Sequence, residues 1–325
     1  MSNKINKKLW TSIIIFALLI LVVLVMFLNK NKNGERNFKN EIINVETEAV
    51  DKIEYIKDGN DIILYKDGDA WKVSKNDTIY TADMKIVNSI FAQLSNVKPM
   101  RIAAVSKEQW GKFDFTPEKQ IDVKYYSGKK EVANFSIGKF EYVEIPAQQQ
   151  GGQGRGSMTT YLKENDGDEN VYVINGFLKT LFPEDFNQLR NKALCTINKA
   201  NISEISATAS DPTNSFMLTQ DYEEHWQYNG IATDSTKTSN YLSRYSNLVA
   251  SKFYNAALPE NIEPEVITIK GNNFSPVKIS IYKHPIIPED YIIVSSANPE
   301  GIFLDNQGNI RKRLFANITE FIKAE

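Results

Sequence analysis

The chain has 325 residues, 42% of them hydrophobic and 24% charged, which is the composition of a globular protein long enough for two domains. Its net charge of −2 falls to about −5 once the three lysines of residues 1–8 are set aside, and this argues against a nucleic-acid partner, which requires a basic face. The single cysteine, Cys195, cannot form an internal disulfide, and its neighbours Leu194 and Thr196 favour a buried, unreactive thiol.

Residues 1–8 form a short basic tail, and the stretch Leu9–Leu28 that follows contains no charged residue. A helix of that length spans about 30 Å, the thickness of a bilayer core. The stretch ends without the small-residue pattern of a cleaved signal peptide, so we expect an uncleaved, single-pass signal anchor. Positive charges lie on both sides of it, and the short tail favours a cytoplasmic N-terminus with the main domain outside the cytoplasm.

Residues 29–46 are polar and of mixed charge, which predicts a tether. A first α+β module is expected over residues 47–199. It opens with a three-stranded meander that carries Trp71 on its third strand. Asp83 can then cap a helix whose apolar residues fall on one face.

Two hairpins are expected later in this module. The second has arms at Phe140–Ile145 and Thr159–Leu162 and a tip rich in glutamine and glycine, Gln148–Ser157. The tip does not fit a phosphate-binding loop, so it is either a flexible tip or a loop that contacts a partner. The candidate partner-contact residues are Gln148, Gln149, Gln150, Gly151, Gly152 and Arg155.

The order of elements recurs more faintly over residues 200–325, where Trp226 corresponds to Trp71 and Asp234 to Asp83. This predicts an α+β fold in which a transmembrane helix precedes two tandem, pseudo-repeated modules of antiparallel sheet with packed helices. Because the two tryptophans occupy corresponding places, core packing is favoured over ligand stacking as their role.

No arrangement of reactive residues predicts chemistry. His225 and His284 have no metal-ligand partners at a suitable spacing, and the acidic cluster Glu164–Asn170 lacks the spacing of a calcium-binding loop, which favours an exposed turn. No serine, histidine and acid combine into a nucleophile motif. We therefore expect no catalytic residues, no metal and no cofactor.

Several short motifs, in this order, resemble the family of the domain of unknown function 4340. They are Lys66–Trp71, Ala82–Asp83, Ile137–Gly138, Tyr142–Val143, Val171–Ile174 and Arg190–Lys192. The resemblance implies a membrane-anchored protein outside the cytoplasm, at the bacterial cytoplasmic (inner) membrane, and lends no catalytic residues. It also implies, for some members, an association with ABC transporter components similar to those of gliding systems.

Two functions are consistent with these observations. The first is a non-enzymatic, membrane-anchored accessory or scaffold protein of the cell envelope that binds another envelope protein or a transporter complex. The alternative is an extracytoplasmic module that binds a peptide or glycan in a groove between the two copies and feeds it to a transporter.

Overall fold

The structure, a computed structural model, describes residue 20, residues 39–145 and residues 155–322. The expected membrane span Leu9–Leu28 therefore lies outside the described residues except for Ile20, and so does the loop Gln148–Gly152. Within the described ranges, no helix has both the length and the apolar character needed to cross a bilayer.

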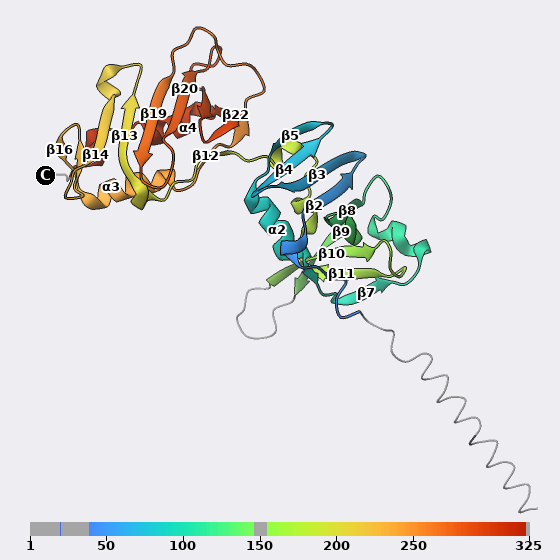
Figure 1. Cartoon of the computed structure of the whole chain (residues 1–325). Coiled ribbons are helices and arrows are strands. Elements are labelled where there is room, and N and C mark those ends of the chain that lie inside the picture. Colours follow the sequence, from blue (N-terminus) through green and yellow to red (C-terminus); the bar gives the residue numbers. More distant parts are fainter. Residues whose placement is uncertain (1–19, 21–38, 146–154, 323–325) are drawn as a thin grey trace, which may run out of the picture.

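The described chain folds into two large antiparallel sheets with few helices (Figure 1). The strand order of the first sheet is β5 (Thr78–Thr81), β4 (Ala70–Lys75), β3 (Asn60–Asp67), β2 (Lys52–Lys57), β8 (Ile121–Ser127), β9 (Lys130–Ile145), β10 (Arg155–Glu164), β11 (Val171–Asn175) and β7 (Arg101–Ala104). That of the second sheet is β16 (Ile231–Ala232), β15 (Trp226–Tyr228), β14 (Phe216–Gln220), β13 (Ile202–Thr208), β19 (Glu265–Gly271), β20 (Val277–Lys283), β21 (Tyr291–Ser295), β22 (Asn298–Asp305) and β18 (Lys252–Phe253).

Two small sheets and short helices complete the fold. The small sheets pair β1 (Ile43–Asn44) with β6 (Asn96–Val97), and β12 (Ala193–Cys195) with β17 (Leu248–Val249). The α-helices are α2 (Met84–Leu94), α3 (Ser235–Leu242) and α4 (Asn309–Leu314). The 3₁₀ segments are Thr47–Ala49, Lys107–Phe113, Leu178–Leu181, Phe186–Gln188, Lys199–Asn201, Pro212–Asn214, Ser243–Tyr245, Asn306–Gly308 and Ile318–Glu320.

The two large sheets have the same strand order when they are compared position by position, from β5 and β16 at one edge to β7 and β18 at the other. The small sheets correspond in the same way, β1 to β12 and β6 to β17. We call residues 39–191 the first module and residues 192–322 the second module. The predicted α+β class with antiparallel sheets is confirmed.

Several elements differ from those expected. The meander at the start of the first module has a fourth strand, β5, and β1 lies inside the stretch expected to be a tether. The helix expected from Ser235 to Val249 ends at Leu242, because its serine- and threonine-rich sequence has low helix propensity. The final helix ends at Leu314, and Asn317 begins a separate 3₁₀ turn by accepting a hydrogen bond from the Thr319 amide.

Each module has a hydrophobic core of its own. In the first, α2 lies over the sheet through Val87, Ile90 and Leu94, and Trp71 meets Phe91 edge to face with ring centroids 5.6 Å apart. In the second, Trp226 occupies the position that corresponds to Trp71 but is only half-buried against the core.

A shared hydrogen bond shows that the two tryptophans correspond. The Trp71 carbonyl accepts from the Ala82 amide at 2.8 Å, and the Trp226 carbonyl accepts from the Thr233 amide at 3.0 Å. In each module the next residue, Asp83 or Asp234, is the N-cap of a helix. The predicted correspondence of Trp71 with Trp226 therefore agrees with the backbone geometry, although their burial differs.

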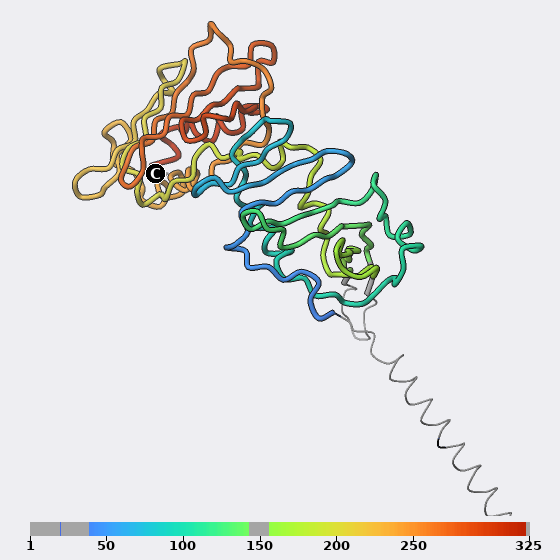
Figure 2. The backbone as a smooth tube through the Cα atoms, turned by 45° about the vertical axis from the view of Figure 1, so that its right-hand side comes forward, coloured from blue at the N-terminus to red at the C-terminus, as the bar shows by residue number. Residues whose placement is uncertain are grey.

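The two modules meet around Arg190, which is 8% exposed. Its guanidinium carbon lies 3.4 Å from the ring centroid of Tyr80 in the first module and 3.8 Å from that of Phe253 in the second. The Glu300 carboxylate accepts from the Thr81 amide at 2.7 Å and pairs with Lys72 at 3.2 Å. The β4–β5 hairpin thereby lies against the second module (Figure 2).

Candidate functional site

Two surface features of the first module are candidates for a functional site, and both are built on the β9–β10 hairpin. The first is the projecting end of the hairpin, Phe140–Ile145 with Arg155–Met158, which we call the arm. Strand β8 pairs with β9 only as far as Ile137, and β11 pairs with β10 only from Thr159. The arm therefore extends past both neighbouring strands. Arg155 opens β10 opposite Ile145, and the other five predicted contact residues lie beyond the described part of the arm.

One face of the arm is apolar and exposed. It continues the face on which Ile137 and Leu162 are fully buried in the core. On the arm, Phe140, Tyr142 and Met158 are 46%, 58% and 46% exposed. Because the residue period of a strand is two and Tyr142 lies directly opposite Met158, these side chains form one continuous strip.

The strip is ordered by local packing. The Phe140 ring contacts that of Phe177 with centroids 4.3 Å apart. Tyr142 lies across the strand pair on Gly156, where an added Cβ would overlap the tyrosine ring. Glycine at this position therefore lets the ring lie flat on the neighbouring strand, an arrangement that shields the backbone of a glycine within a sheet.

Charged and aromatic side chains hold the opposite face at the base of the arm. Lys139 pairs with Glu141 at 2.6 Å, and the Tyr161 hydroxyl donates to Glu141 at 2.7 Å. The hydrogen bond from Lys139 lowers the pKa of Glu141, and the same bond raises the pKa of Lys139. Lys139 also lies over the Phe113 and Tyr161 rings. These contacts fix the direction in which the arm leaves the sheet.

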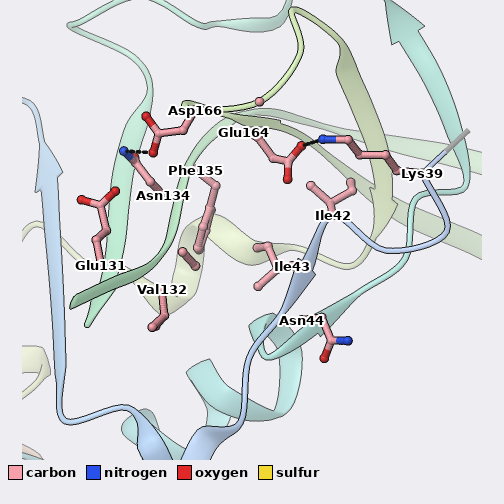
Figure 3. Close-up of a pocket in the computed structure, with 12 residues that line it drawn as sticks. Lys39, Ile42, Ile43, Asn44, Glu131, Val132, Asn134, Phe135, Glu164 and Asp166 are labelled. Carbon is pink, nitrogen blue, oxygen red and sulfur yellow. Dashed lines mark hydrogen bonds and ion pairs between the residues drawn. The ribbon is translucent and has the colours of Figure 1, made fainter. Parts of the chain in front are cut away.

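The second feature is a cavity of about 410 Å³ at the other end of the same hairpin, which we call the slot (Figure 3). One wall is Glu131–Phe135 of β9, and the other is Ile42–Asn44, which includes β1. The acidic turn that begins at Glu164 closes one side, where Lys39 pairs with Glu164. Its volume is within the usual range for ligand pockets.

A hydrogen-bonded network orders the acidic turn. Asp166 accepts from the Asn134 amide at 2.8 Å, and the Asn165 amide group donates to Asn134 at 2.8 Å. Ser136, which is fully buried, donates to Asn165 at 2.8 Å and to Asp122 at 2.5 Å. The predicted exposed turn is therefore tied to β9 at its base.

A buried lysine supports this network from below. Lys163 is 5% exposed, donates to Asn165 and lies 4.5 Å from the centroid of the Trp110 ring. Burial lowers the pKa of Lys163. Its position under the turn indicates a structural role, because its ammonium points at the protein rather than into the slot.

The remaining residues that were considered for chemistry lie apart from both features. His225 is exposed beside Asp221 and Glu223, and Nδ1 of His284 accepts from the Ile286 and Ile287 amides within a turn. Across the described ranges, no three His, Cys, Asp or Glu side chains are grouped so that they could hold a metal ion. The Cys195 thiol is buried and contacts the Tyr245 carbonyl at 3.5 Å.

Reasoning from sequence selected the tip of the hairpin but missed Phe140, Tyr142 and Met158. Their alternation was read as an ordinary half-buried strand. The available signal was length, since β9 continues for 16 residues while its partner β8 has only 7, so that part of β9 had to extend beyond the sheet.

Fold and surface together define an α+β protein of two large antiparallel sheets. The chain belongs to the family described as Domain of unknown function (DUF4340), whose model matches residues 71–265, more than half of the chain. The match runs from Trp71 through the Arg190 junction into β19 of the second module, and it bears out the resemblance carried by the short motifs. No curated protein matches the chain.

Proposed function

We propose that this protein is a membrane-anchored, extracytoplasmic accessory or scaffold protein that binds another envelope protein or a transporter complex and carries out no catalysis. Leu9–Leu28 is its single-pass anchor, residues 1–8 are its cytoplasmic tail, and the two modules are copies of one ancestral unit. The observation that carries the proposal is the arm, which presents a strip of large apolar side chains to solvent. Such strips on otherwise polar surfaces mark protein interaction sites.

The place of the arm supports a partner in or at the membrane. The first described residues, drawn in blue, and the free end of the arm lie on the side of the first module that faces away from the second (Figures 1 and 2). Only ten residues separate Leu28 from Lys39, so they reach at most about 35 Å when fully extended. An anchor at Leu9–Leu28 therefore keeps the arm near the bilayer.

Composition of the strip favours a protein over lipid as the occupant. Phe140, Tyr142 and Met158 are of the residue types that are enriched in protein–protein interfaces. The strip is also preformed, because Phe177 and Gly156 fix its two rings, and a preformed surface loses little side-chain entropy on binding.

Site-specific photocrosslinking in native membranes tests this proposal. A benzoylphenylalanine placed at Tyr142 of the full-length chain should crosslink to one discrete membrane-associated protein. The same probe at Tyr222, which is 93% exposed in the second module, is the matched control and should not give that product. Equal labelling from both positions, or no product from Tyr142, would contradict a partner site on the arm.

A variant with Phe140, Tyr142 and Met158 all replaced by serine extends the test. Its purification from mild detergent should lose the crosslinked partner, while its melting temperature stays close to that of the wild type, because all three side chains are about half exposed. Retention of the partner by this variant would refute the proposed role of the strip.

The alternative function, a module that feeds a peptide or glycan to a transporter, is favoured by a different observation. The slot is a cavity of ligand size with polar groups at its rim, and it lies within the first module rather than between the two copies. A ligand that binds only the folded chain must raise its melting temperature, so a thermal-shift screen of peptides and oligosaccharides tests this alternative.

A further inference from the structure

The wall of the slot formed by β9 is a strand edge. Strand β10 ends at Glu164, which lies opposite Phe135. The Asn165 amide donates to the Asn134 carbonyl at 3.0 Å, and among the described strands none pairs with Glu131–Ala133 on that side. On its other side the same stretch pairs with β8, which holds it in an extended conformation. Such an edge can accept main-chain hydrogen bonds from an added strand.

The second module shows what the corresponding place looks like when it is closed. There β12, the counterpart of β1, contacts the end of β21 and the start of β22 directly. The Ser295 hydroxyl donates to the Leu194 carbonyl at 2.5 Å, and the Asn298 amide donates to the carbonyls of Asn191 at 3.0 Å and Ala193 at 3.1 Å.

A longer connection accompanies the open slot of the first module. Strands β21 and β22 are joined by two residues, whereas six residues, 165–170, join β10 to β11. At the position that corresponds to Ser295, the first module has Lys163 and Glu164, and Glu164 reaches only the side chain of Lys39. The first module thus leaves open a space that direct backbone contacts fill in the second.

The chemistry of the slot selects its occupant. Four apolar side chains form its floor: Ile42, Ile43, Val132 and Phe135. The rim has three carboxylates, on Glu131, Glu164 and Asp166, against one ammonium, on Lys39. In Figure 3 the Glu131 and Asp166 side chains extend from the β9 side of the slot. Alternating apolar and basic side chains on an extended strand would match this floor and rim.

We propose that the slot binds an extended, basic peptide segment of another protein, which adds to the edge of β9 as a strand. Its main chain bonds to β9 between Glu131 and Asn134, its apolar residues lie on the floor, and its lysine or arginine residues pair with Glu131 and Asp166. Strand addition of this kind takes affinity from the main chain and specificity from alternate side chains. The slot and the arm are at opposite ends of one hairpin, so this proposal stands whether or not the arm binds a partner.

Fluorescence anisotropy with designed peptides tests the proposal on the full-length chain in mild detergent. The probe is a fluorescein-labelled peptide that alternates lysine and valine over seven residues. It should bind, and a peptide of the same length that alternates glutamate and valine should not. A third peptide, methylated on alternate backbone nitrogens of the lysine–valine sequence, cannot donate main-chain hydrogen bonds and should lose binding.

Protein variants locate the site. Replacing Glu131 by Gln together with Asp166 by Asn keeps side-chain shape and should weaken binding about tenfold, since two ion pairs are lost. The control, Glu260→Gln with Glu263→Gln, makes the same change in net charge at exposed positions of the second module and should bind as the wild type does. Asn44→Trp, which fills the slot from β1, should abolish binding.

Three outcomes would overturn the inference. They are absence of binding by the lysine–valine peptide, equal binding by the N-methylated peptide, and equal weakening by both pairs of charge variants. The first two would exclude strand addition, and the third would reduce the effect to the net charge of the protein.

Discussion

Replacing Arg190 by Ala should uncouple the two modules. The guanidinium lies between the rings of Tyr80 and Phe253, donates to the Asn187 side chain at 2.9 Å and donates to the Glu300 carbonyl at 3.2 Å. Two desolvated cation–π contacts contribute up to about 2 kcal/mol each, and two hydrogen bonds about 1 kcal/mol each.

One feature of the wild type offsets part of this stabilisation. Within the described residues, Nε of Arg190 is buried and has no hydrogen-bond partner, which costs about 1–3 kcal/mol. Truncation removes that cost together with the contacts. The net loss at the junction is therefore about 3 kcal/mol. Arg190→Lys should recover less than half of it, because a lysine cannot stack on two rings as a planar group.

Guanidinium-induced unfolding of the full-length chain in mild detergent, followed by tryptophan fluorescence, measures the effect. We expect the wild type to unfold in one cooperative transition and Arg190→Ala to unfold in two. Arg244→Ala is the matched control, because Arg244 pairs with Glu320 inside the second module at 2.7 Å and lies away from the junction. If Arg190→Ala unfolds in a single transition at the wild-type midpoint, the reasoning about the junction is refuted.

Three further predictions concern burial and charge. Trp71→Ala should cost about 3–5 kcal/mol in chemical denaturation and Trp226→Ala about 1–2, because only Trp71 is fully buried; equal costs would contradict this. Burial raises the pKa of Cys195 to about 12, so its thiol should react with Ellman's reagent at pH 8 only after denaturation, and reaction in the native state would exclude a buried thiol. Burial opposes ionisation of Glu300, but hydrogen bonds from Thr81 and Lys72 lower its pKa below the ordinary 4.5, so its stabilising contribution is complete above pH 4.5 and is lost as the pH falls through the lowered pKa. Glu300→Gln should therefore flatten the acid dependence of unfolding below pH 4.5, and an unchanged profile would show that Glu300 makes no such contribution.

Much of the fold could be predicted from local patterns. Strand alternation around polar turns located β2, β3 and β4, and the apolar spacing after Asp83 located α2, because both signals depend on near neighbours in the chain. The recurrence of a tryptophan before a capping aspartate indicated the repeat. The nine-strand order was beyond this reasoning, since pairing of β7 with β11 joins residues about seventy positions apart and depends on the whole sheet.

The candidate sites were less predictable for a related reason. The acidic turn at Glu164 was visible, but the slot beside it depends on β1, a two-residue strand with no sequence signal of its own. The exposed strip was hidden because Phe140 and Tyr142 alternate as buried strand residues do. Exposure in the arm results from where the neighbouring strands stop, and that is a property of tertiary structure.

The segment Leu189–Asn191 also determines how a mechanical load would pass between the modules. The Leu189 carbonyl accepts from the Asp83 amide at 2.8 Å, and the Asn191 amide donates to the Thr81 carbonyl at 2.8 Å. Tension applied to the second module must therefore break these bonds before it can extend the linker. Until they break, the force enters the first module at the edge of its large sheet through the β4–β5 hairpin, and the two modules behave as one lever rather than as two beads on a string.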